Sequence, residues 1–182
     1  RILASSEGPD TERWRIVPSL QSSPGKYNAD ILEGLDFLLS EMKKREMYAV
    51  MVLNNFWPWS GGMAQYIQWH GAGPIPYPPP QPGGSWDVYQ KYTAQFYVHK
   101  KAKKGFKRFL SFLVSRKNSL TGVLYKNDPT IMSWELANEP RGINQTNAFN
   151  EWIKETSAWI KTRAPLQLVT LGSEGDTPWP QG

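Results

Sequence analysis

Apolar residues recur at helical spacing in several stretches of the chain. In the first stretch they are Ile31, Leu32, Leu35, Leu38, Leu39 and Met42. Similar spacing runs over 85–96, 100–116 and 146–163. Side chains that repeat every three or four residues line one face of a helix. We therefore predict helices at these places. In the first helix, which runs to about residue 45, Asp30 and Glu33 are predicted to form a capping pair.

Short apolar runs alternate with these helices. They cover 48–53, 131–136 and 166–171. Runs of this length without polar alternation are typical of strands buried on both faces. The order of strands and helices predicts βα units on a parallel sheet, which is an α/β fold class. A barrel and an open sheet both fit this alternation.

The connections between these elements are rich in glycine, proline and polar residues. The segment 54–84 is rich in glycine, proline and aromatic residues, and a connection this long is usually functional. Its stretch 71–74 contains a proline and does not directly follow a strand. It therefore does not match the glycine-rich turn of a dinucleotide-binding sheet. Residues 117–130 and 172–182 are predicted to be loops.

The bulk composition fits one globular domain. The chain has 182 residues, of which 40% are hydrophobic and 20% charged, so it can bury a core. No apolar run reaches about 18 residues, and we expect no membrane span. The chain starts at Arg1 without a signal-like segment. The absence of cysteine excludes disulfides, and His70 and His99 are too far apart in sequence to predict a zinc site.

The net charge of +5 comes largely from one predicted helix, which carries Lys100, Lys101, Lys103, Lys104, Lys107 and Arg108. Such a run is typical of a patch that binds nucleic acid or a membrane. It is equally typical of the solvated face of a helix. Apolar residues fall at helical spacing between these cations, and this favours the solvated face.

Aromatic residues are abundant, with nine Trp, eight Tyr and seven Phe. Many lie in Pro- and Gly-rich stretches such as 56–59 and 77–80. Because loops run over the surface, we expect these rings to be partly exposed. Exposed flat rings suit stacking against sugars, and less often against nucleobases.

The apolar run 131–136 continues into Asn138, Glu139 and Pro140. A carboxyl at the end of a buried strand is costly unless it is used, so Glu139 is a candidate general acid/base. Asn138 can hydrogen-bond a sugar hydroxyl. The alternative is that both residues only cap the following loop. Polar residues also follow the other predicted strands, where parallel α/β proteins place their sites: Asn54-Asn55 and Ser173-Glu174.

The segment from Trp134 to Arg141 resembles the acid/base motif of glycoside hydrolase family 5, in particular its β-mannanases. Other segments are similar to that family in the same order along the chain: 24–36, 53–66, 116–131 and 171–175. The resemblance implies that residues 1–182 are part of a (β/α)8 TIM barrel, from about the end of strand two to strand five. It also implies a secreted endo-β-1,4-mannanase that acts on mannan-type polysaccharides with retention, without cofactor or metal.

The same resemblance assigns roles to individual residues. Glu139 matches the general acid/base, and Asn138 the asparagine that binds the sugar beside the nucleophile. Arg1 falls where the family has an arginine at the end of strand two, near the nucleophile. Arg141 matches an arginine on the leaving-group side of the cleft. The tryptophans Trp57 and Trp59 are candidate stacking platforms, with loop anchoring as the alternative.

The family's nucleophile is a glutamate at the end of strand seven, and the resemblance ends at strand five. Retention requires two carboxylates about 5–5.5 Å apart. Glu174 matches the strand-five motif, so we expect a structural role for it. The nucleophile is therefore expected outside this chain, either in further sequence or in a second chain that completes the barrel, and the isolated chain is expected to be inactive. Three alternatives stay open: a non-catalytic carbohydrate-binding fragment, a related β-1,4-glucanase, and a basic nucleic-acid binder.

Overall fold

The centre of the protein is a parallel sheet of four short strands. In the computed structural model, which describes residues 1–12 and 14–175, the strand order is β1-β4-β5-β6. The strands span β1 (Ile2–Leu3), β4 (Ala49–Val52), β5 (Ile131–Glu135) and β6 (Leu168–Thr170). In register, Met51 pairs with Trp134, and Trp134 with Val169. The strands predicted over 48–53, 131–136 and 166–171 are confirmed, and a very short strand precedes them.

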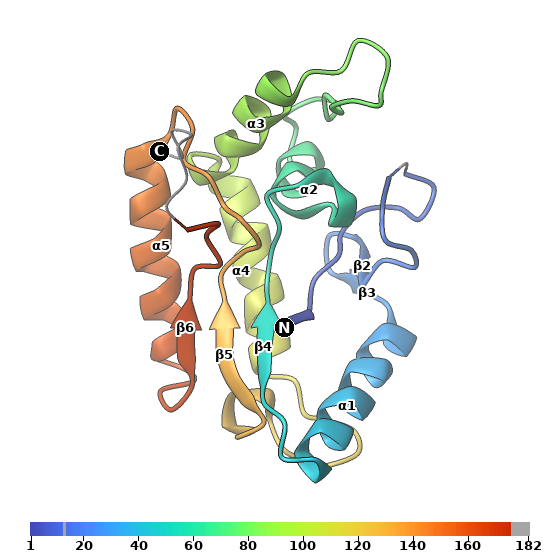
Figure 1. Cartoon of the computed structure of the whole chain (residues 1–182), viewed down its shortest axis with the longest axis vertical. Helices are drawn as coiled ribbons and strands as arrows, with labels where there is room; N and C mark the ends of the chain where they lie inside the picture. The colour runs from blue at the N-terminus through green and yellow to red at the C-terminus, as the bar shows by residue number, and fades with distance from the viewer. Residues whose placement is uncertain (13, 176–182) are drawn as a thin grey trace.

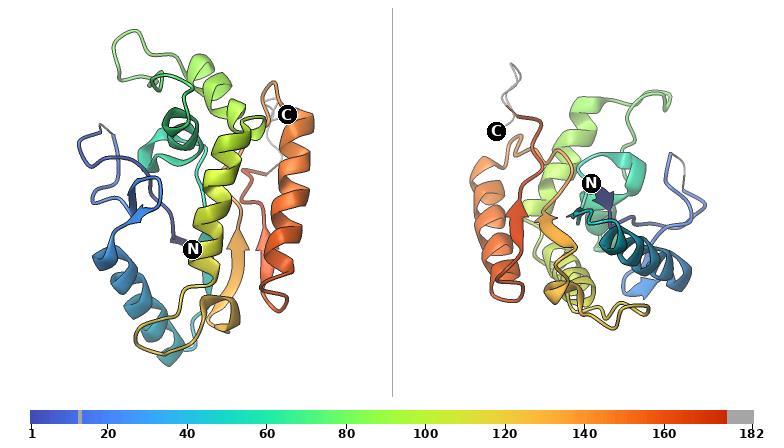
Figure 2. Two further views of the ribbon diagram at one scale, coloured as in Figure 1. Left: turned by 180° about the vertical axis from the view of Figure 1, so that it is seen from behind. Right: turned by 60° about the horizontal axis from the view of Figure 1, so that its bottom comes forward.

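The helices pack around this sheet. They span α1 (Ala29–Lys44), α2 (Gly62–Trp69), α3 (Trp86–Ala94), α4 (Lys100–Val114) and α5 (Thr146–Lys161). Figure 1 shows α4 behind the strands and α5 beside β6, and the view from behind in Figure 2 brings α4 to the front. Helices α2 and α3 lie beyond the carboxyl ends of the strands (Figure 1). Within the described residues, no helix is long and apolar enough to cross a membrane.

Smaller elements complete the described part. A two-stranded antiparallel sheet joins β2 (Gln21–Ser23) to β3 (Lys26–Tyr27). Single 3₁₀ turns cover Pro58–Ser60, Gln95–Tyr97 and Tyr125–Asn127. The predicted loop over 172–182 lies outside the described residues from residue 176 onward.

The predicted cap of the first helix is wrong by two residues. Asn28, not Asp30, is the N-cap of α1, and its side-chain oxygen accepts from the backbone N–H of Asp30 at 3.0 Å and of Ile31 at 3.3 Å. Asparagine is among the best N-cap residues because its short side chain satisfies donors that the helix leaves free. Asp30 instead lies in the first turn, where a negative charge suits the helix dipole.

The segment 54–84 is not one continuous loop. It contains α2, in which Met63, Ala64, Tyr66 and Ile67 are all buried. Their spacing is helical, but the surrounding glycines, prolines and aromatic residues obscured it. This helix places its N-terminus beside the ends of the strands, where the candidate site lies.

Aromatic side chains fill the core between α4 and α5. Phe106 and Trp152 have ring centroids 6.3 Å apart, and Phe96 lies within 6.0 Å of both. Tyr97 contacts Trp152 at 5.4 Å between centroids. Many of the aromatic residues are therefore core residues, and the cationic side chains of α4 alternate with a buried apolar face: Ala102, Phe106, Phe109, Leu110, Leu113 and Val114. This supports the solvated-face interpretation of the lysine run.

A buried carboxylate ties α1 to the loop before β5. The Asp36 side chain is 0% exposed and accepts from Arg116 Nη2 at 2.6 Å, the Ser119 N–H at 3.1 Å and the Tyr125 hydroxyl at 2.5 Å. Burial alone raises the pKa of Asp36, but these donors outweigh it and leave that pKa below its usual value.

Candidate active site

The two segments that follow β4 and β5 stay hydrogen-bonded to each other beyond the ends of the strands. The N–H of Asn138 donates to the carbonyl of Asn54 at 2.9 Å, and the N–H of Phe56 donates to the carbonyl of Asn138 at 3.1 Å. This pairing brings two buried amides together, and Asn138 Nδ2 donates to Asn55 Oδ1 at 3.1 Å. This pairing places the next residue, Glu139, at the carboxyl end of the sheet.

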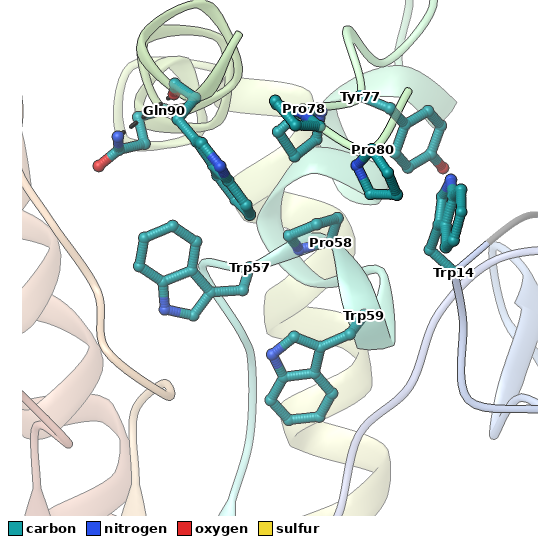
Figure 3. Close-up of a pocket in the computed structure, with 10 residues that line it drawn as sticks. Trp14, Trp57, Pro58, Trp59, Tyr77, Pro78, Pro80 and Gln90 are labelled. Carbon is teal, nitrogen blue, oxygen red and sulfur yellow. Dashed lines mark hydrogen bonds between the residues drawn. The ribbon is translucent and has the colours of Figure 1, made fainter. Parts of the chain in front are cut away.

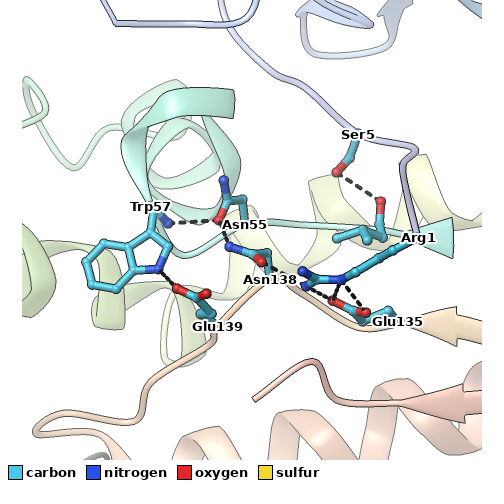
Figure 4. A network of polar contacts seen from close by, with 8 residues as sticks. Arg1, Ser5, Asn55, Trp57, Glu135, Asn138 and Glu139 are labelled. Carbon is cyan, nitrogen blue, oxygen red and sulfur yellow. Dashed lines mark hydrogen bonds and ion pairs between the residues drawn. The ribbon is translucent and has the colours of Figure 1, made fainter. Parts of the chain in front are cut away.

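Glu139 has an unusual backbone and a tightly placed carboxylate. Its φ is +49°, in the left-handed region, a conformation that costs energy for residues other than glycine. Its N–H donates to the carbonyl of Gly172 at 2.9 Å, which links it to the segment after β6. The Trp57 indole Nε1 donates to Glu139 Oε2 at 2.5 Å (Figure 4). Strain of this kind clusters at functional sites, so Glu139 remains the candidate acid/base.

Arg1 joins the site from the first strand. It lies immediately before β1, which contains the next two residues. Its guanidinium forms an ion pair with Glu135, with Nε 2.9 Å from Oε2, and donates from Nη2 to Asn138 Oδ1 at 2.8 Å (Figure 4). Hydrogen bonding to Glu135 raises the pKa of Arg1 above its usual value. Arg1 therefore holds Asn138 in place while neutralising the buried Glu135.

Arg141 connects the segment after Glu139 to helix α3 and to the segment after β6. It forms a bidentate ion pair with Glu174, with Nε 2.8 Å from Oε2 and Nη2 2.8 Å from Oε1, and donates from Nη1 to Gln90 Oε1 at 2.9 Å. Its guanidinium carbon is 4.9 Å from the centroid of the Trp57 ring. Glu174 is thus engaged with Arg141, which agrees with the structural role expected for it. Trp57 thus contacts Glu139 through a hydrogen bond and Arg141 through stacking. Its role as a platform for a sugar stays a prediction.

Trp59 is separated from this network. Its side chain is 40% exposed and it lines a hollow of about 510 Å³ together with Trp57. We call this hollow the aromatic pocket (Figure 3). Its lining residues are Trp14, Trp57, Pro58, Trp59, Tyr77, Pro78, Pro79, Pro80, Trp86 and Gln90.

A second buried carboxylate lies behind the site. Glu7 is 2% exposed and accepts from the N–H of Gly62, the first residue of α2, at 2.9 Å. Burial raises its pKa to about 8, although the Gly62 N–H and the charge of Arg15 oppose the rise. Glu7 therefore anchors the start of α2 to the segment that carries Arg1.

The described residues contain no group of three or more His, Asp or Glu side chains that could hold a metal ion. His70 and His99, distant in sequence, have ring centroids 6.5 Å apart. His99 has a structural role, since its Nδ1 accepts from the Ala102 N–H at 3.2 Å as the N-cap of α4.

Several residues of the site were not predicted from the sequence. Glu135, Glu7 and Arg15 hold the predicted residues or the pocket walls in place. Only the position of Glu135, at the buried end of β5, carried a signal that could have identified it. A buried carboxylate requires a partner.

Comparison with known proteins identifies the family. A family model described as GH family 5 beta-mannosidase-like matches residues 1–179. The chain belongs to this family of glycoside hydrolases. Its resemblance, first inferred from the segment Trp134 to Arg141, is therefore confirmed.

Both curated sequences and solved structures resemble this family 5 chain. It is 37% identical over 180 residues to mannan endo-1,4-beta-mannosidase 5 of Solanum lycopersicum, covering 96% of this chain and 38% of that protein. It is 36% identical over 179 residues to mannan endo-1,4-beta-mannosidase 4 of Oryza sativa subsp. japonica, covering 96% of this chain and 34% of that protein. A crystal structure of a glycoside hydrolase family 5 mannosidase from Rhizomucor miehei superposes with a TM-score of 0.88 and 43% identity, covering 97% of this chain and 42% of that one.

A glutamate-to-alanine variant of the Rhizomucor miehei enzyme was solved in complex with mannosyl-fructose, and this chain matches it with a TM-score of 0.89 and 42% identity over 97% of its length. The family 5 chain spans well under half the length of these relatives. The parallel sheet described above is accordingly a portion of the family's (β/α)8 barrel, as predicted.

Proposed function

We propose that this chain supplies the acid/base half of the active site of an enzyme that hydrolyses β-1,4-mannosidic bonds in mannan-type polysaccharides. The observation that carries the proposal is the placement of Glu139, strained and hydrogen-bonded to Trp57 at the mouth of a family 5 sheet. The names of the tomato and rice relatives support mannan as the substrate. They also support cleavage at bonds inside the polysaccharide and not at its ends.

The contacts of Glu139 suggest which of its oxygens carries the proton. Oε2 accepts the hydrogen bond from Trp57, and no hydrogen bond within the described residues reaches Oε1. An acid that accepts at one oxygen can carry its proton on the other. In the proposed reaction, Glu139 Oε1 donates this proton to the glycosidic oxygen as the glycosidic bond breaks and a nucleophile carboxylate bonds to the anomeric carbon. The Glu139 carboxylate then deprotonates the water that displaces the nucleophile from that carbon.

Asn138 and Arg1 prepare the side of the site on which a nucleophile acts. Asn138 uses one amide hydrogen on Asn55 and its oxygen on Arg1, which leaves the second amide hydrogen for a sugar hydroxyl. The two nearby carboxylates, Glu135 and Glu174, are each ion-paired with an arginine. We propose that the nucleophile is a further carboxylate about 5–5.5 Å from Glu139, supplied by sequence outside residues 1–182.

We also propose that the protein is secreted, because a mannan polysaccharide is too large to enter a cell before it is cleaved. The remaining strands of the barrel would come from further sequence or from a second chain.

The proposal is tested with the protein that carries the whole barrel. Purified enzyme is incubated with β-1,4-mannan, galactomannan, glucomannan and β-1,4-glucan, and the first product is followed by proton NMR. We expect rapid cleavage of the mannans and a first product with the β-anomeric configuration. Cleavage of glucan in preference to mannan would support the β-1,4-glucanase alternative. Tight binding without cleavage would support the carbohydrate-binding alternative, and a first product with the α configuration would exclude the retaining mechanism.

A further inference from the structure

A small groove lies between α4 and α5, which run side by side in the view from behind (Figure 2). Its volume is about 170 Å³, and it shares no lining residue with the aromatic pocket. The side chains that reach its rim are Lys103, Lys104 and Lys107 from α4 and Glu155 and Trp159 from α5. A family 5 barrel would continue from the outer strands β1 and β6, so the groove between these two helices stays on its outer surface.

Positive charge dominates this groove. Glu155 is the one carboxylate among its lining residues, and its Oε2 lies 3.8 Å from Lys103 Nζ. Lys104 and Lys107 are exposed, and neither forms an ion pair within the described residues. Cations that the protein does not neutralise itself attract anions to the surface that carries them.

Arg163 adds a further cation beside the groove. Its guanidinium carbon lies 4.0 Å from the centroid of the Trp159 ring. Its Nη1 donates to the Trp159 carbonyl at 3.2 Å and to Thr162 Oγ1 at 3.0 Å. Within residues 1–12 and 14–175, Nε and Nη2 of this exposed arginine make no hydrogen bond. These two nitrogens form one planar edge, which matches the two oxygens of a carboxylate.

Two other arginines of the chain hold carboxylates with the same edge. Arg141 donates from Nε and Nη2 to Glu174, at 2.8 Å each. Arg116 donates from Nε and Nη2 to Asp36, at 3.0 and 2.6 Å. Because Arg163 presents this edge to solvent, a carboxylate from another molecule can bind it in the same way.

Trp159 holds two of the cations in place. Lys107 Nζ lies 6.0 Å from the centroid of its ring, and the Arg163 guanidinium lies closer still. Cation–π contacts at these distances are favourable and restrict long side chains. Side chains that are ordered before binding lose less conformational entropy when a ligand arrives. We call Lys104, Lys107, Trp159 and Arg163 the cationic surface, and it is preorganised for an anion.

The groove also limits which anion fits. Glu155 can accept hydrogen bonds from hydroxyl groups, but it repels closely spaced negative charges. Duplex DNA carries one charge about every 1.7 Å along its axis, whereas a polymer of uronic acids carries one carboxylate per sugar ring among several hydroxyls. The groove is smaller than the roughly 300–1,000 Å³ of a pocket that encloses a small molecule. These features favour a sugar polymer that lies along the surface.

We propose that the cationic surface binds an anionic polysaccharide whose sugar units carry uronic-acid carboxylates. One carboxylate binds the Nε and Nη2 edge of Arg163, the charge of Lys107 attracts the polymer, and Glu155 accepts from a hydroxyl. Because the surface lies on the outer helices, a polymer bound there leaves the candidate active site free. The inference does not depend on the proposed function.

The test measures the binding of polygalacturonate to the protein that carries the whole barrel. Salt is kept at about 0.15 M, which screens attraction between distant exposed charges. The variant Lys107→Gln/Arg163→Gln removes two positive charges from the cationic surface. The matched control, Lys26→Gln/Lys43→Gln, removes two positive charges from exposed positions elsewhere. We expect Kd to rise about tenfold or more in the first variant, as loss of one hydrogen bond between charged groups implies, and to stay within about threefold of wild type in the control.

A second comparison leaves the protein unchanged. Methyl esterification of polygalacturonate removes its carboxylate charges and keeps its sugar rings. We expect the wild-type protein to bind the esterified polymer about tenfold or more weakly than the acidic one. Equal affinity for the two polymers would refute the role of the carboxylates, whatever the variants show.

Four other results would overturn the proposal. They are no binding of polygalacturonate by the wild type, equal affinity in all three proteins, an equal loss in both double variants, and duplex DNA bound as tightly as polygalacturonate. The rate of mannan cleavage, measured in parallel, should stay within about twofold of wild type in both variants, because the surface lies outside the candidate active site. If the wild type does not cleave mannan, the proposed function fails, and the binding data still decide this inference.

Discussion

At the scale of single residues, the site depends on side chains that hold Glu139 rather than on Glu139 alone. The indole N–H of Trp57 is the clearest example, since it donates to the carboxylate at 2.5 Å. Arg1 and Asn55 hold Asn138 in the same way. None of these contacts follows from local sequence patterns, because the partners lie far apart in the chain.

Replacement of Trp57 by phenylalanine tests its positioning role. The ring is kept, but the donor to Glu139 is lost, and a hydrogen bond to a charged group contributes about 1.5–3 kcal/mol. We expect kcat on mannan to fall about 10- to 100-fold, with little change in KM. Trp159→Phe, on α5 and outside the site, is the matched control. Wild-type kcat in Trp57→Phe would show that the contact does not position the carboxylate.

The raised pKa of Glu7 predicts how the stability of the protein changes with pH. Its pKa is about 8 in the folded protein against 4.5 for the free group, so the folded state binds more protons between these values. Its contribution to stability is therefore present in full below about pH 4.5 and is lost as the pH rises through about 8, by about 1.4 kcal/mol per unit. We expect the unfolding free energy of Glu7→Gln, measured in urea between pH 5 and 8, to depend less steeply on pH than that of the wild type.

The exposed carboxyl of Glu33 on α1 provides the control for this experiment. Glu33→Gln should follow the wild-type profile. Parallel profiles for Glu7→Gln and wild type would contradict the assignment of a raised pKa to Glu7.

At the scale of elements, the start of α2 connects the fold to the site. Gly62 has a φ of +56°, and a Cβ there would lie 2.1 Å from the carbonyl oxygen of Asn55. Its N–H also donates to Glu7. Because Asn55 supports Asn138, a shift of α2 would be transmitted to the site.

The variant Gly62→Ala should therefore lose both stability and activity. We expect a loss of about 2–4 kcal/mol in unfolding free energy, from backbone strain and overlap with a neighbouring carbonyl. The control is Gly34→Ala in α1, where a Cβ would meet nothing within 4 Å and where alanine should stabilise by about 0.5–1 kcal/mol. Thermal and urea unfolding of both variants measures these changes. Equal stability of the two variants would refute the role given to Gly62.

The elements themselves were largely predictable. The helices now seen as α1, α4 and α5 carry long apolar stripes, and their predicted bounds are within about two residues of those observed. The helix α2 was missed because glycine, proline and aromatic residues dominate its segment, although the spacing of Met63, Tyr66 and Ile67 was helical. Glu139 and Asn138 were predicted from the end of a buried strand and Arg1 from the family resemblance, and Arg1 does contact Asn138. The network around Glu7 and Arg15 was not predictable, since tertiary contacts alone create it.

At the scale of the whole molecule, the sheet is open at both sides within the described residues. Its outer strands are β1 and β6, and Leu168 on β6 is 60% exposed. Unpaired strand edges and exposed apolar side chains are unfavourable in a protein that ends there. The remaining strands of a family 5 barrel would cover both edges.

We therefore expect the isolated 182-residue chain to release no reducing sugar from mannan, because its carboxylates near Glu139 are ion-paired and the nucleophile is proposed to lie elsewhere. The assay uses the purified chain and the whole-barrel protein at equal molar concentration, and the whole-barrel protein is the positive control. Turnover by the isolated chain comparable to that of the whole barrel would contradict this arrangement.

The most direct test of the central claim is the rescue of Glu139→Ala by azide, in the protein that carries the whole barrel. If Glu139 is the general acid/base, this variant should lose about 10²–10⁴-fold in kcat on mannan but retain cleavage of an aryl β-mannoside whose leaving group needs no proton. Added azide should accelerate that reaction and yield a β-mannosyl azide, since azide attacks the glycosyl–enzyme without base assistance. Turnover of mannan within a few-fold of wild type, or no azide adduct despite cleavage of the aryl mannoside, would contradict the account.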